Sequence, residues 1–286
     1  MAPEHLRRTE DYFDAANGRK LFFRCWQPTE PDRVMVLVHG FGEHSGRYEE
    51  IATWFAHQGF VVYAHDQLGH GHSPGKRGHV DRFDDLLDDV ECLIDLAGKS
   101  HVDLLRVLVG HSMGGLIVTA LACERRLDVD LVAASGPALA LSPDISRMKL
   151  LLAGILQRFA PRLAMNAGLD PSGLSTDSAV VREYLADPLV HSQITASLAA
   201  GMSGKVRRLQ GAATNPRLPM LLLHGEADPI CDVEGSRVFH RQSQQAPQSK
   251  TELRTYPGLL HEIFNEPDRL GVYADLLDWI RRTEYR

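Results

Sequence analysis

The side chain best suited to nucleophilic chemistry is that of Ser112, which stands in a Gly-x-Ser-x-Gly pattern over residues 110–114. An apolar run over residues 105–109 leads into the pattern, and a helical pattern follows it over residues 114–124. A serine on a tight strand-to-helix turn presents its hydroxyl at the helix start, where the dipole favours developing negative charge. The two glycines leave room for crossing segments, so this context predicts a nucleophile rather than a chance match.

His261 is the histidine best placed to activate this serine. It follows a strand expected over residues 251–256, and no other histidine occurs after residue 240. In a Ser-His-Asp triad the imidazole takes the serine proton during attack on an acyl carbon, and later returns a proton to the leaving group. His261 is therefore predicted to be the base for Ser112.

Three acidic residues follow the strand expected over residues 220–223, namely Glu226, Asp228 and Asp232. In proteins with this nucleophile pattern, the acid lies between the serine and the histidine in chain order. Asp232 is better suited to cap the helix expected over residues 233–239. We therefore predict that Asp228 fixes the imidazole tautomer and stabilises its cation, with Asp232 and Glu226 as rivals.

A second glycine-containing segment, His39-Gly40-Phe41-Gly42, follows the strand expected over residues 34–38. One backbone donor to the reacting oxyanion comes from such a loop, and the other is the N–H after the nucleophile. The backbone amides of Phe41 and Met113 are therefore predicted to form the oxyanion hole. A loop that merely turns the chain is the alternative, but it would not explain why the glycines follow this strand.

The elements that must position these residues alternate between strands and helices. Asn17-Gly18 suits the positive φ angles of a tight turn and predicts a hairpin over residues 9–26. Short apolar runs bounded by turn residues predict buried strands, and helical patterns lie between the early runs. This alternation predicts an α/β fold with a mostly parallel central sheet and helices on both faces. The remaining expected elements are strands over 34–38, 60–64, 105–109, 131–134, 220–223 and, more weakly, 251–256, and helices over 48–58, 83–97 and 114–124.

The regular alternation stops after residue 138. Residues 139–209 contain no good buried-strand run but several helix-like stretches, which predicts a helical cap inserted between core parts 1–138 and 210–286. Ligands of open α/β sheets bind beyond the carboxyl ends of the strands. A cap leaving a strand end at this position would cover the site.

The length, composition and charge of the whole chain limit the classes of protein to which it can belong. Its 286 residues, 44% of them apolar, suffice for one α/β core with an insertion. A formal net charge of −6 argues against a nucleic-acid partner. The four cysteines are widely spaced, and we see neither a secretory signal nor a membrane-spanning run. These features predict reduced thiols and a cytoplasmic location.

Four histidines crowd residues 65–79, and two of them form His70-Gly71-His72, a pattern that can bind zinc if Asp66 adds a ligand. The alternative is a glycine-rich loop folded by its own polar side chains, among them Asp66, Ser73 and Arg77. We favour the loop, and we expect neither a metal nor a cofactor.

With these residues placed, the chain resembles the monoacylglycerol lipase family of the α/β-hydrolase superfamily. The resemblance covers nearly the whole predicted core and supports the triad and both oxyanion amides. It implies a serine hydrolase that cleaves monoacylglycerols to fatty acid and glycerol through an acyl-enzyme. Lysophospholipases, broad carboxylesterases, peptidases and catalytically silent hydrolase folds are the alternatives; a silent fold usually lacks a triad member, and none is missing. The matching segments are residues 39–48, 65–78, 110–115, 224–232 and 256–267.

The resemblance also implies an acyl tunnel beneath the cap and a polar pocket for the glycerol head near Glu43 and Arg47. Tyr184 joins these substrate-binding candidates because residues 184–189 fit the family's Tyr-x-x-Asp-Pro-Leu pattern. The alternative for Glu43 and Arg47 is a salt bridge at a helix N-terminus, with Ser45 as the N-cap.

The cap sequence suggests how the enzyme reaches a lipid ester. Residues 148–160 read MKLLLAGILQRFA, whose apolar surface is broader than a packed surface helix needs, although the segment is too short to span a bilayer. Residues 138–209 carry eight Lys/Arg and five Asp/Glu, a net charge of +3 against −9 for the remainder. Our hypothesis is reversible docking of the cap on micelles or anionic membranes. The alternative is that these leucines line the tunnel or pack on the core.

Overall fold

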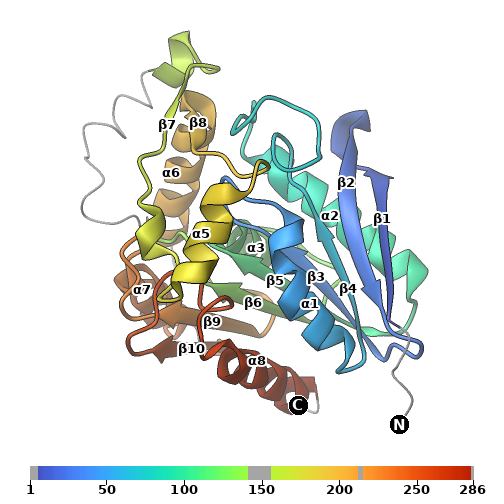
Figure 1. Ribbon diagram of the computed structural model, residues 1–286. Helices are drawn as coiled ribbons and strands as arrows, with labels where there is room; N and C mark the ends of the chain where they lie inside the picture. Colours follow the sequence, from blue (N-terminus) through green and yellow to red (C-terminus); the bar gives the residue numbers. More distant parts are fainter. Residues whose placement is uncertain (1–5, 141–155, 212–214, 285–286) are drawn as a thin grey trace.

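The computed structural model describes residues 6–140, 156–211 and 215–284. Within these residues an eight-stranded sheet runs through the molecule in the order β1-β2-β4-β3-β5-β6-β9-β10 (Figure 1). The strands from β4 to β10 pair in parallel, whereas β1 and β2 pair antiparallel with each other and β2 pairs antiparallel with β4. The strands are β1 (Arg7–Asp14), β2 (Lys20–Gln27), β3 (Arg33–Val38), β4 (Phe60–His65), β5 (Leu105–His111), β6 (Leu131–Ser135), β9 (Met220–Gly225) and β10 (Thr251–Tyr256).

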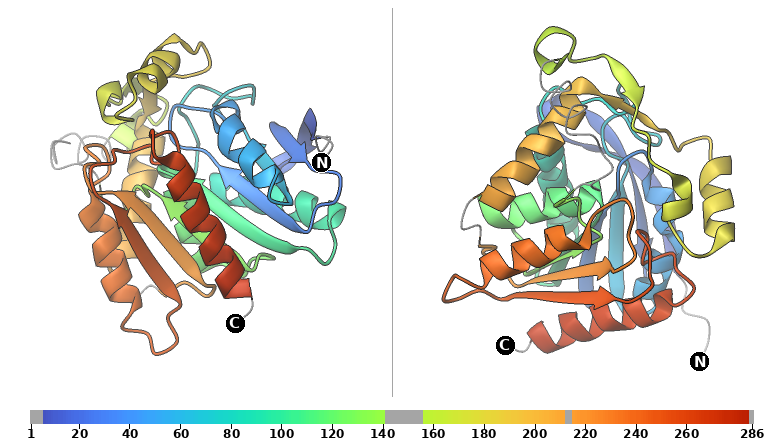
Figure 2. Two further views of the ribbon diagram at one scale, coloured as in Figure 1. Left: turned by 60° about the horizontal axis from the view of Figure 1, so that its bottom comes forward. Right: turned by 90° about the vertical axis from the view of Figure 1, so that its left-hand side faces the viewer.

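Helices cover both faces of this sheet (Figure 2). On one face α1 (Glu49–Ala56) and α8 (Arg269–Glu284) bury an apolar cluster that includes Trp26, Phe55 and Trp279. On the other face, Leu21, Leu87 and Leu116 belong to a second cluster. The mostly parallel sheet with helices on both faces is therefore confirmed. The helices that contribute to the second cluster include α2 (Asp84–Ser100), α3 (Met113–Glu124) and α7 (Val233–Ser243).

The expected strands all form, and the N-terminal hairpin turns where predicted. Asn17 and Gly18 have φ angles of 57° and 70°, and Asp14 pairs with Lys20 on the returning strand. The strand expected with least weight, residues 251–256, forms β10 over those residues and pairs along its whole length with β9. Local apolar runs and turn residues were thus enough to locate the sheet.

The segment between β6 and β9 differs from a purely helical cap. It contains η3 (Pro171–Gly173), α5 (Ser178–Ala186) and α6 (Ala196–Gly211), but also two short antiparallel strands, β7 (Ala164–Asn166) and β8 (Gln193–Thr195). Each of these strands has three residues, too few to give an alternating pattern. We call residues 156–211 the insertion; the cap boundaries at 139 and 209 stay a prediction.

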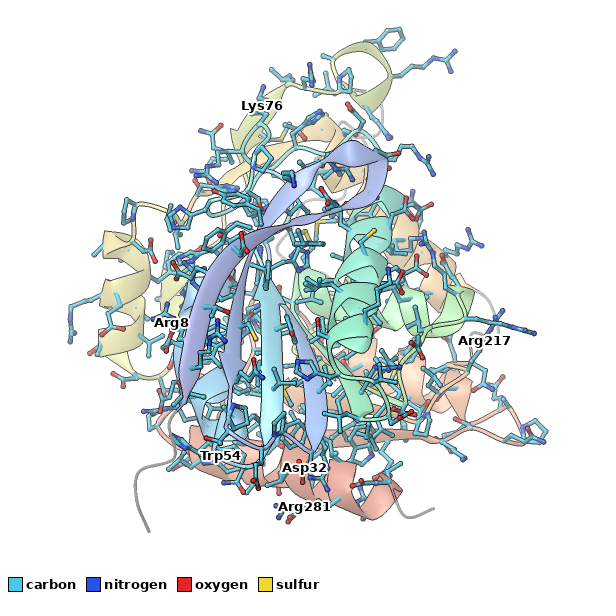
Figure 3. All side chains as sticks on the ribbon, turned by 90° about the vertical axis from the view of Figure 1, so that its right-hand side faces the viewer. Arg8, Asp32, Trp54, Lys76, Arg217 and Arg281 are labelled. Atoms are coloured by element: carbon cyan, nitrogen blue, oxygen red, sulfur yellow. The ribbon has the colours of Figure 1, made fainter. Side chains whose placement is uncertain are left out.

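The insertion is attached to the loops at the carboxyl ends of the core strands. The backbone N–H groups of His191 and Thr195 donate to Gly42 O and Gly78 O, in the loops after β3 and β4. Lys76, labelled in Figure 3, comes from the same loop as Gly78, and its Nζ donates to Arg162 O at 2.6 Å. The insertion therefore covers the edge of the sheet where a ligand is expected.

The apolar segment over residues 148–160 lies mostly outside the described residues. Of its last residues, Phe159 is 79% exposed. Among the described residues no helix is long and apolar enough to cross a membrane. The four cysteines, Cys25, Cys92, Cys123 and Cys231, are free thiols.

The turn from β5 into α3 is packed so closely that it requires glycine. A Cβ atom on Gly114 would lie 2.1 Å from Val38 O and 2.6 Å from His39 O, and one on Gly110 would lie 2.3 Å from Gly114 O. The end of β3 and the start of α3 thus cross close to these glycines, as the sequence analysis predicted for the segments around the serine.

We predict that Gly114→Ala lowers the free energy of unfolding by about 2 kcal/mol or more, because backbone atoms must move to admit the methyl group. Gly271→Ala is the matched control, since nothing lies within 4 Å of its Cβ position in α8. That variant should gain about 0.5 kcal/mol from its helix propensity. Urea unfolding measures both, and equal stabilities would contradict the packing argument.

Candidate active site

Ser112 sits between β5 and α3 in a backbone conformation that few residues adopt. Its φ and ψ angles are 54° and −115°, and such strain persists only where neighbouring structure enforces it. Ser112 N donates to Ser135 O at 2.9 Å, while Ser112 O accepts from Leu116 N and Ala138 N at 2.9 and 3.0 Å. Backbone hydrogen bonds from β6, from α3 and from the chain after β6 therefore hold the residue in place.

His261 and Asp228 form a buried hydrogen-bonded pair. His261 Nδ1 lies 2.7 Å from Asp228 Oδ2, and the backbone N–H groups of Ile230 and Cys231 donate to Asp228 Oδ1 at 2.8 and 2.9 Å. A second imidazole, that of His224, lies 3.1 Å from Asp228 Oδ2. Burial would raise the pKa of Asp228, but the His261 charge and these hydrogen bonds hold that pKa well below its ordinary value.

The two rival acids point to other partners. Asp232 caps α7 by accepting from Glu234 N at 2.9 Å, as predicted for a helix N-cap. Glu226 accepts from Thr255 Oγ1 at 2.7 Å in a solvent-exposed hydrogen bond. Of the three carboxylates after β9, only Asp228 contacts His261.

The environment of His261 favours its protonated form. Burial lowers the pKa of this imidazole, but the Asp228 charge and hydrogen bond outweigh burial, so the pKa lies above its ordinary value. The neighbouring His111, whose ring centroid is 4.7 Å away, behaves oppositely: burial and the proximity of His261 lower its pKa to about 4. His261 is thus the imidazole suited to accept a proton near neutral pH.

Ser112 and His261 line one cavity of about 500 Å³ between the core and the insertion. Its polar lining includes Glu43, Tyr184 and His191. Apolar side chains supply much of the remaining wall, among them Phe41, Leu169, Leu174, Leu185, Val190 and Ile230. A cavity with a few polar groups in an apolar wall is typical of sites for small amphipathic molecules.

One of the two predicted oxyanion donors, Phe41, lines this cavity, and the other, Met113, directly follows Ser112 in the chain. Met113 is the first residue of α3, so its N–H has no acceptor within the helix. Phe41 lines the cavity, and a Cβ on the preceding Gly40 would lie 3.1 Å from Ser112 Cβ. The loop after β3 therefore lies directly against the serine.

The three predicted substrate-binding residues do not all face the same space. Glu43 and Tyr184 line the cavity of Ser112, whereas Arg47 lines a neighbouring cavity of about 420 Å³. Arg47 NH1 donates to Glu43 Oε2 at 2.8 Å, which is the salt bridge considered as the alternative role. The Arg47 guanidinium also lies over the Tyr184 ring, 4.8 Å from its centroid.

The predicted N-cap role of Ser45 is wrong. His44 caps the turn η2 (Ser45–Tyr48), because its Nδ1 accepts from Gly46 N at 3.1 Å. Ser45 is instead engaged by Asp66 Oδ1, which accepts from Ser45 Oγ and N at 2.5 and 2.8 Å.

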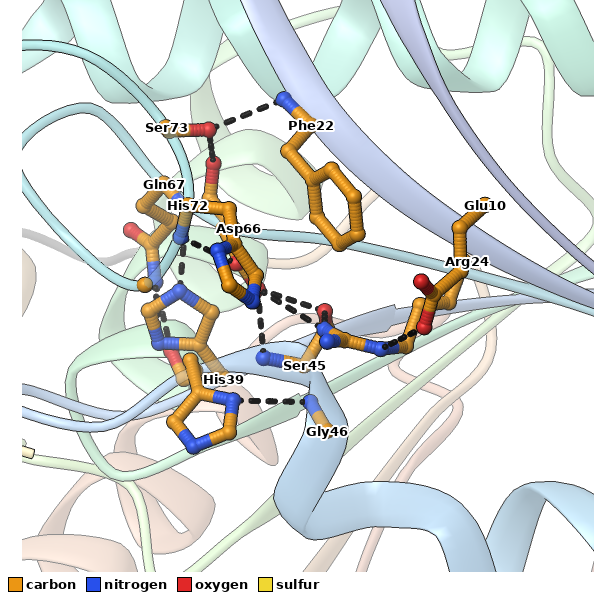
Figure 4. A network of polar contacts seen from close by, with 12 residues as sticks. Glu10, Phe22, Arg24, His39, Ser45, Gly46, Asp66, Gln67, His72 and Ser73 are labelled. Atoms are coloured by element: carbon orange, nitrogen blue, oxygen red, sulfur yellow. Dashed lines mark hydrogen bonds and ion pairs between the residues drawn. The ribbon is translucent and has the colours of Figure 1, made fainter. Parts of the chain in front are cut away.

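The histidine-rich loop after β4 is folded by its own polar side chains (Figure 4). Asp66 Oδ2 accepts from His72 N at 2.7 Å, and Ser73 Oγ donates to Asp66 O and accepts from Phe22 N. Arg77 NH1 donates to Gly71 O at 2.8 Å. Within the described parts of the chain, no three His, Cys, Asp or Glu side chains are grouped to hold a metal ion.

Sequence reasoning missed Glu262 and His224. The two terminal nitrogens of Arg47, NH1 and NH2, donate to the Glu262 carboxylate at 2.5 and 2.8 Å. His224 Nε2 lies within hydrogen-bond distance of Asp228. The only signal for them in the sequence is position: Glu262 follows His261, and His224 follows the strand expected over residues 220–223. The Arg47–Glu262 contact joins residues 215 positions apart, so spacing alone does not reveal it.

The fold and this site define an α/β hydrolase, and comparisons with known proteins agree. The family model described as "Serine aminopeptidase, S33" matches residues 29–268. The chain is 35% identical over 96% of its length to a monoacylglycerol lipase of Mycolicibacterium smegmatis, covering 97% of that relative. It is 34% identical to a mouse monoglyceride lipase, over 93% of this chain and 88% of that one.

A crystal structure of Paleococcus ferrophilus monoacylglycerol lipase aligns with a TM-score of 0.82 at 34% identity, covering 98% of this chain and 99% of that one. The protein therefore belongs to the serine aminopeptidase S33 family of α/β hydrolases, as a monoacylglycerol lipase-like serine hydrolase.

We predict that Asp228→Asn lowers kcat by about 10⁴-fold, because the amide favours the wrong His261 tautomer. Asp232→Asn is the matched control, since its carboxylate caps a helix and does not contact His261. Ester hydrolysis rates compare the two. A larger loss in Asp232→Asn would show that Asp228 is not the acid.

Proposed function

We propose that this protein hydrolyses monoacylglycerols to fatty acid and glycerol. The observation that carries the proposal is that His261, paired with the buried Asp228, lines the same cavity as the strained Ser112. The names of the relatives at 34–35% identity support the substrate class. Lysophospholipids and simple carboxylic esters are the competing substrates, since the same triad cleaves both.

The proposed reaction begins when Ser112 Oγ attacks the ester carbonyl carbon and its proton passes to His261 Nε2. Nδ1 of that imidazole donates to Asp228, which fixes the tautomer and stabilises the cation. The negative charge that develops on the carbonyl oxygen is stabilised by the N–H groups of Phe41 and Met113. Each such donor contributes on the order of 3 kcal/mol to transition-state stabilisation.

The tetrahedral intermediate collapses when its bond to the glycerol oxygen breaks. His261 gives that oxygen its proton, and the acyl group stays on Ser112. A water molecule then attacks the acyl-enzyme, His261 takes the water proton, and the second collapse releases the fatty acid with Ser112 reprotonated.

The lining of the cavity supports a substrate with one acyl chain and a small polar head. The apolar wall suits the chain, and Glu43 and Tyr184 are the polar groups proposed to face the glycerol hydroxyls. Both Glu43 oxygens already accept hydrogen bonds from the protein, from Gly40 N, Tyr48 OH and Arg47. A glycerol hydroxyl would therefore donate to the one remaining lone pair, on Glu43 Oε2.

A hydrolysis panel tests this proposal with monoacylglycerols, diacylglycerols, triacylglycerols, lysophospholipids and short p-nitrophenyl esters. We expect kcat/KM to be highest for monoacylglycerol, and at least about tenfold lower for triacylglycerol, because two further chains would compete for a cavity of about 500 Å³. Ser112→Ala should lose turnover and labelling by a fluorophosphonate probe while keeping its fold. A higher kcat/KM for lysophospholipid would make lysophospholipid the preferred substrate in place of monoacylglycerol. Labelling of Ser112→Ala would show that Ser112 is not the nucleophile.

We further propose that the insertion docks reversibly on lipid. Phe159, Leu163 and Leu185 are 79%, 48% and 65% exposed, and the surrounding residues 138–209 carry a net positive charge. Exposed apolar side chains in a cationic segment favour an anionic lipid interface.

Vesicle co-sedimentation should show binding that strengthens with anionic lipid and weakens in Phe159→Ser/Leu163→Ser. Val102→Ser is the control, because Val102 is 67% exposed but precedes β5 at the opposite edge of the sheet. If the wild type bound no vesicle, only the alternative would remain. In that alternative the apolar residues of the segment over residues 148–160 line the acyl tunnel or pack on the core.

A further inference from the structure

Glu262, the residue after His261, is buried and engaged on both carboxylate oxygens. Arg47 donates through NH1 to Oε1 at 2.5 Å and through NH2 to Oε2 at 2.8 Å. Asn265 Nδ2 donates to Oε2 at 2.8 Å, and the side chain is only 4% exposed. A two-pronged pair between a guanidinium and a carboxylate fixes orientation as well as distance.

Arg47 extends this pair to the loop on the other side of the cavity. It donates to Glu43 Oε2 at 2.8 Å, and Glu43 Oε1 accepts from Gly40 N at 2.6 Å. Gly40 directly precedes Phe41, the proposed oxyanion donor. A continuous chain of buried polar contacts therefore runs from the residue after His261 to the residue before Phe41.

The charges along this chain do not cancel. Glu43 and Glu262 share one guanidinium, which leaves one uncompensated negative charge near the His261 imidazole. Two other groups face that imidazole: Asp228 at 2.7 Å, and the His111 ring at 4.7 Å between centroids. Burial lowers the pKa of His261, while the charges of Asp228, Glu262 and Glu43 raise it.

We propose that Glu262 is a positioning residue for the hydrolytic reaction, which fixes the His261 loop against the Phe41 loop through Arg47 and keeps a negative charge beside the base. The inference rests on the proposed role of His261 as the base. It does not depend on which ester is the substrate.

The test compares Glu262→Gln with Arg47→Lys, using p-nitrophenyl butyrate between pH 5 and 9. Glu262→Gln removes the charge with little change of shape, so the midpoint of the kcat/KM profile should fall by on the order of one pH unit. Its kcat should fall roughly tenfold because the loop loses its anchor. Arg47→Lys keeps the positive charge but loses the two-pronged hydrogen bond to Glu262. Its kcat should therefore fall, while the midpoint of the kcat/KM profile should stay at the wild-type value.

Glu252→Gln is the matched control, since Glu252 pairs with Arg282 on the exposed surface of β10. It should leave both the midpoint and kcat at wild-type values. A wild-type midpoint in Glu262→Gln overturns the proposal whatever happens to kcat, because a loss of rigidity alone does not move a titration.

Nuclear magnetic resonance titration of the His261 imidazole, assigned by comparison with His261→Gln, gives the same midpoint without turnover. Turnover of p-nitrophenyl butyrate without turnover of monoacylglycerol would reject the proposed substrate while leaving the Glu262 test intact. If the enzyme turned over neither ester, the proposed function would fail, and an unshifted titration in Glu262→Gln would separately overturn this inference.

Discussion

The strained backbone of Ser112 is the constraint on which the rest of the site depends. A serine with a φ of 54° and a ψ of −115° lies outside the regions that such residues normally populate, so the surrounding contacts must enforce this conformation. Here the enforcing contacts are the hydrogen bonds of Ser112 N and O, together with the close approach of Gly114 to the end of β3. The same approach brings the loop after β3 against the serine. One packing arrangement in the core thus fixes both the proposed nucleophile and the loop that carries the proposed oxyanion donor Phe41.

The insertion supports the two loops that complete the site. His191 N donates to Gly42 O at 2.8 Å, beside the proposed oxyanion donor, and Gly42 has a φ of 76°. A Cβ on Gly42 would lie 2.3 Å from His191 O, so only glycine permits this approach. On the other side, His261 N donates to Gly173 O at 3.3 Å. The insertion therefore forms part of the framework around Ser112 as well as its cover.

Local patterns in the sequence predicted most of the fold and the elements that carry the candidate triad. The strands and the turn at Asn17-Gly18 depend on apolar runs and turn residues, which are local signals. What escaped prediction depends on contacts between distant segments, such as the pairing of three-residue strands β7 and β8. The N-cap at Ser45 was wrong because Asp66, from another loop, binds that hydroxyl. The ion pair of Arg47 with Glu262 likewise becomes visible only when the loops after β3 and β10 meet.

The central claim is that Ser112 becomes acylated by the substrate. Mass spectrometry of enzyme quenched in acid during turnover of a monoacylglycerol tests it most directly. The account predicts a mass increase equal to the acyl group minus one hydrogen, located on the peptide that contains Ser112 and absent from Ser112→Ala. Turnover with the acyl group on another residue, or an adduct that persists in Ser112→Ala, would contradict it.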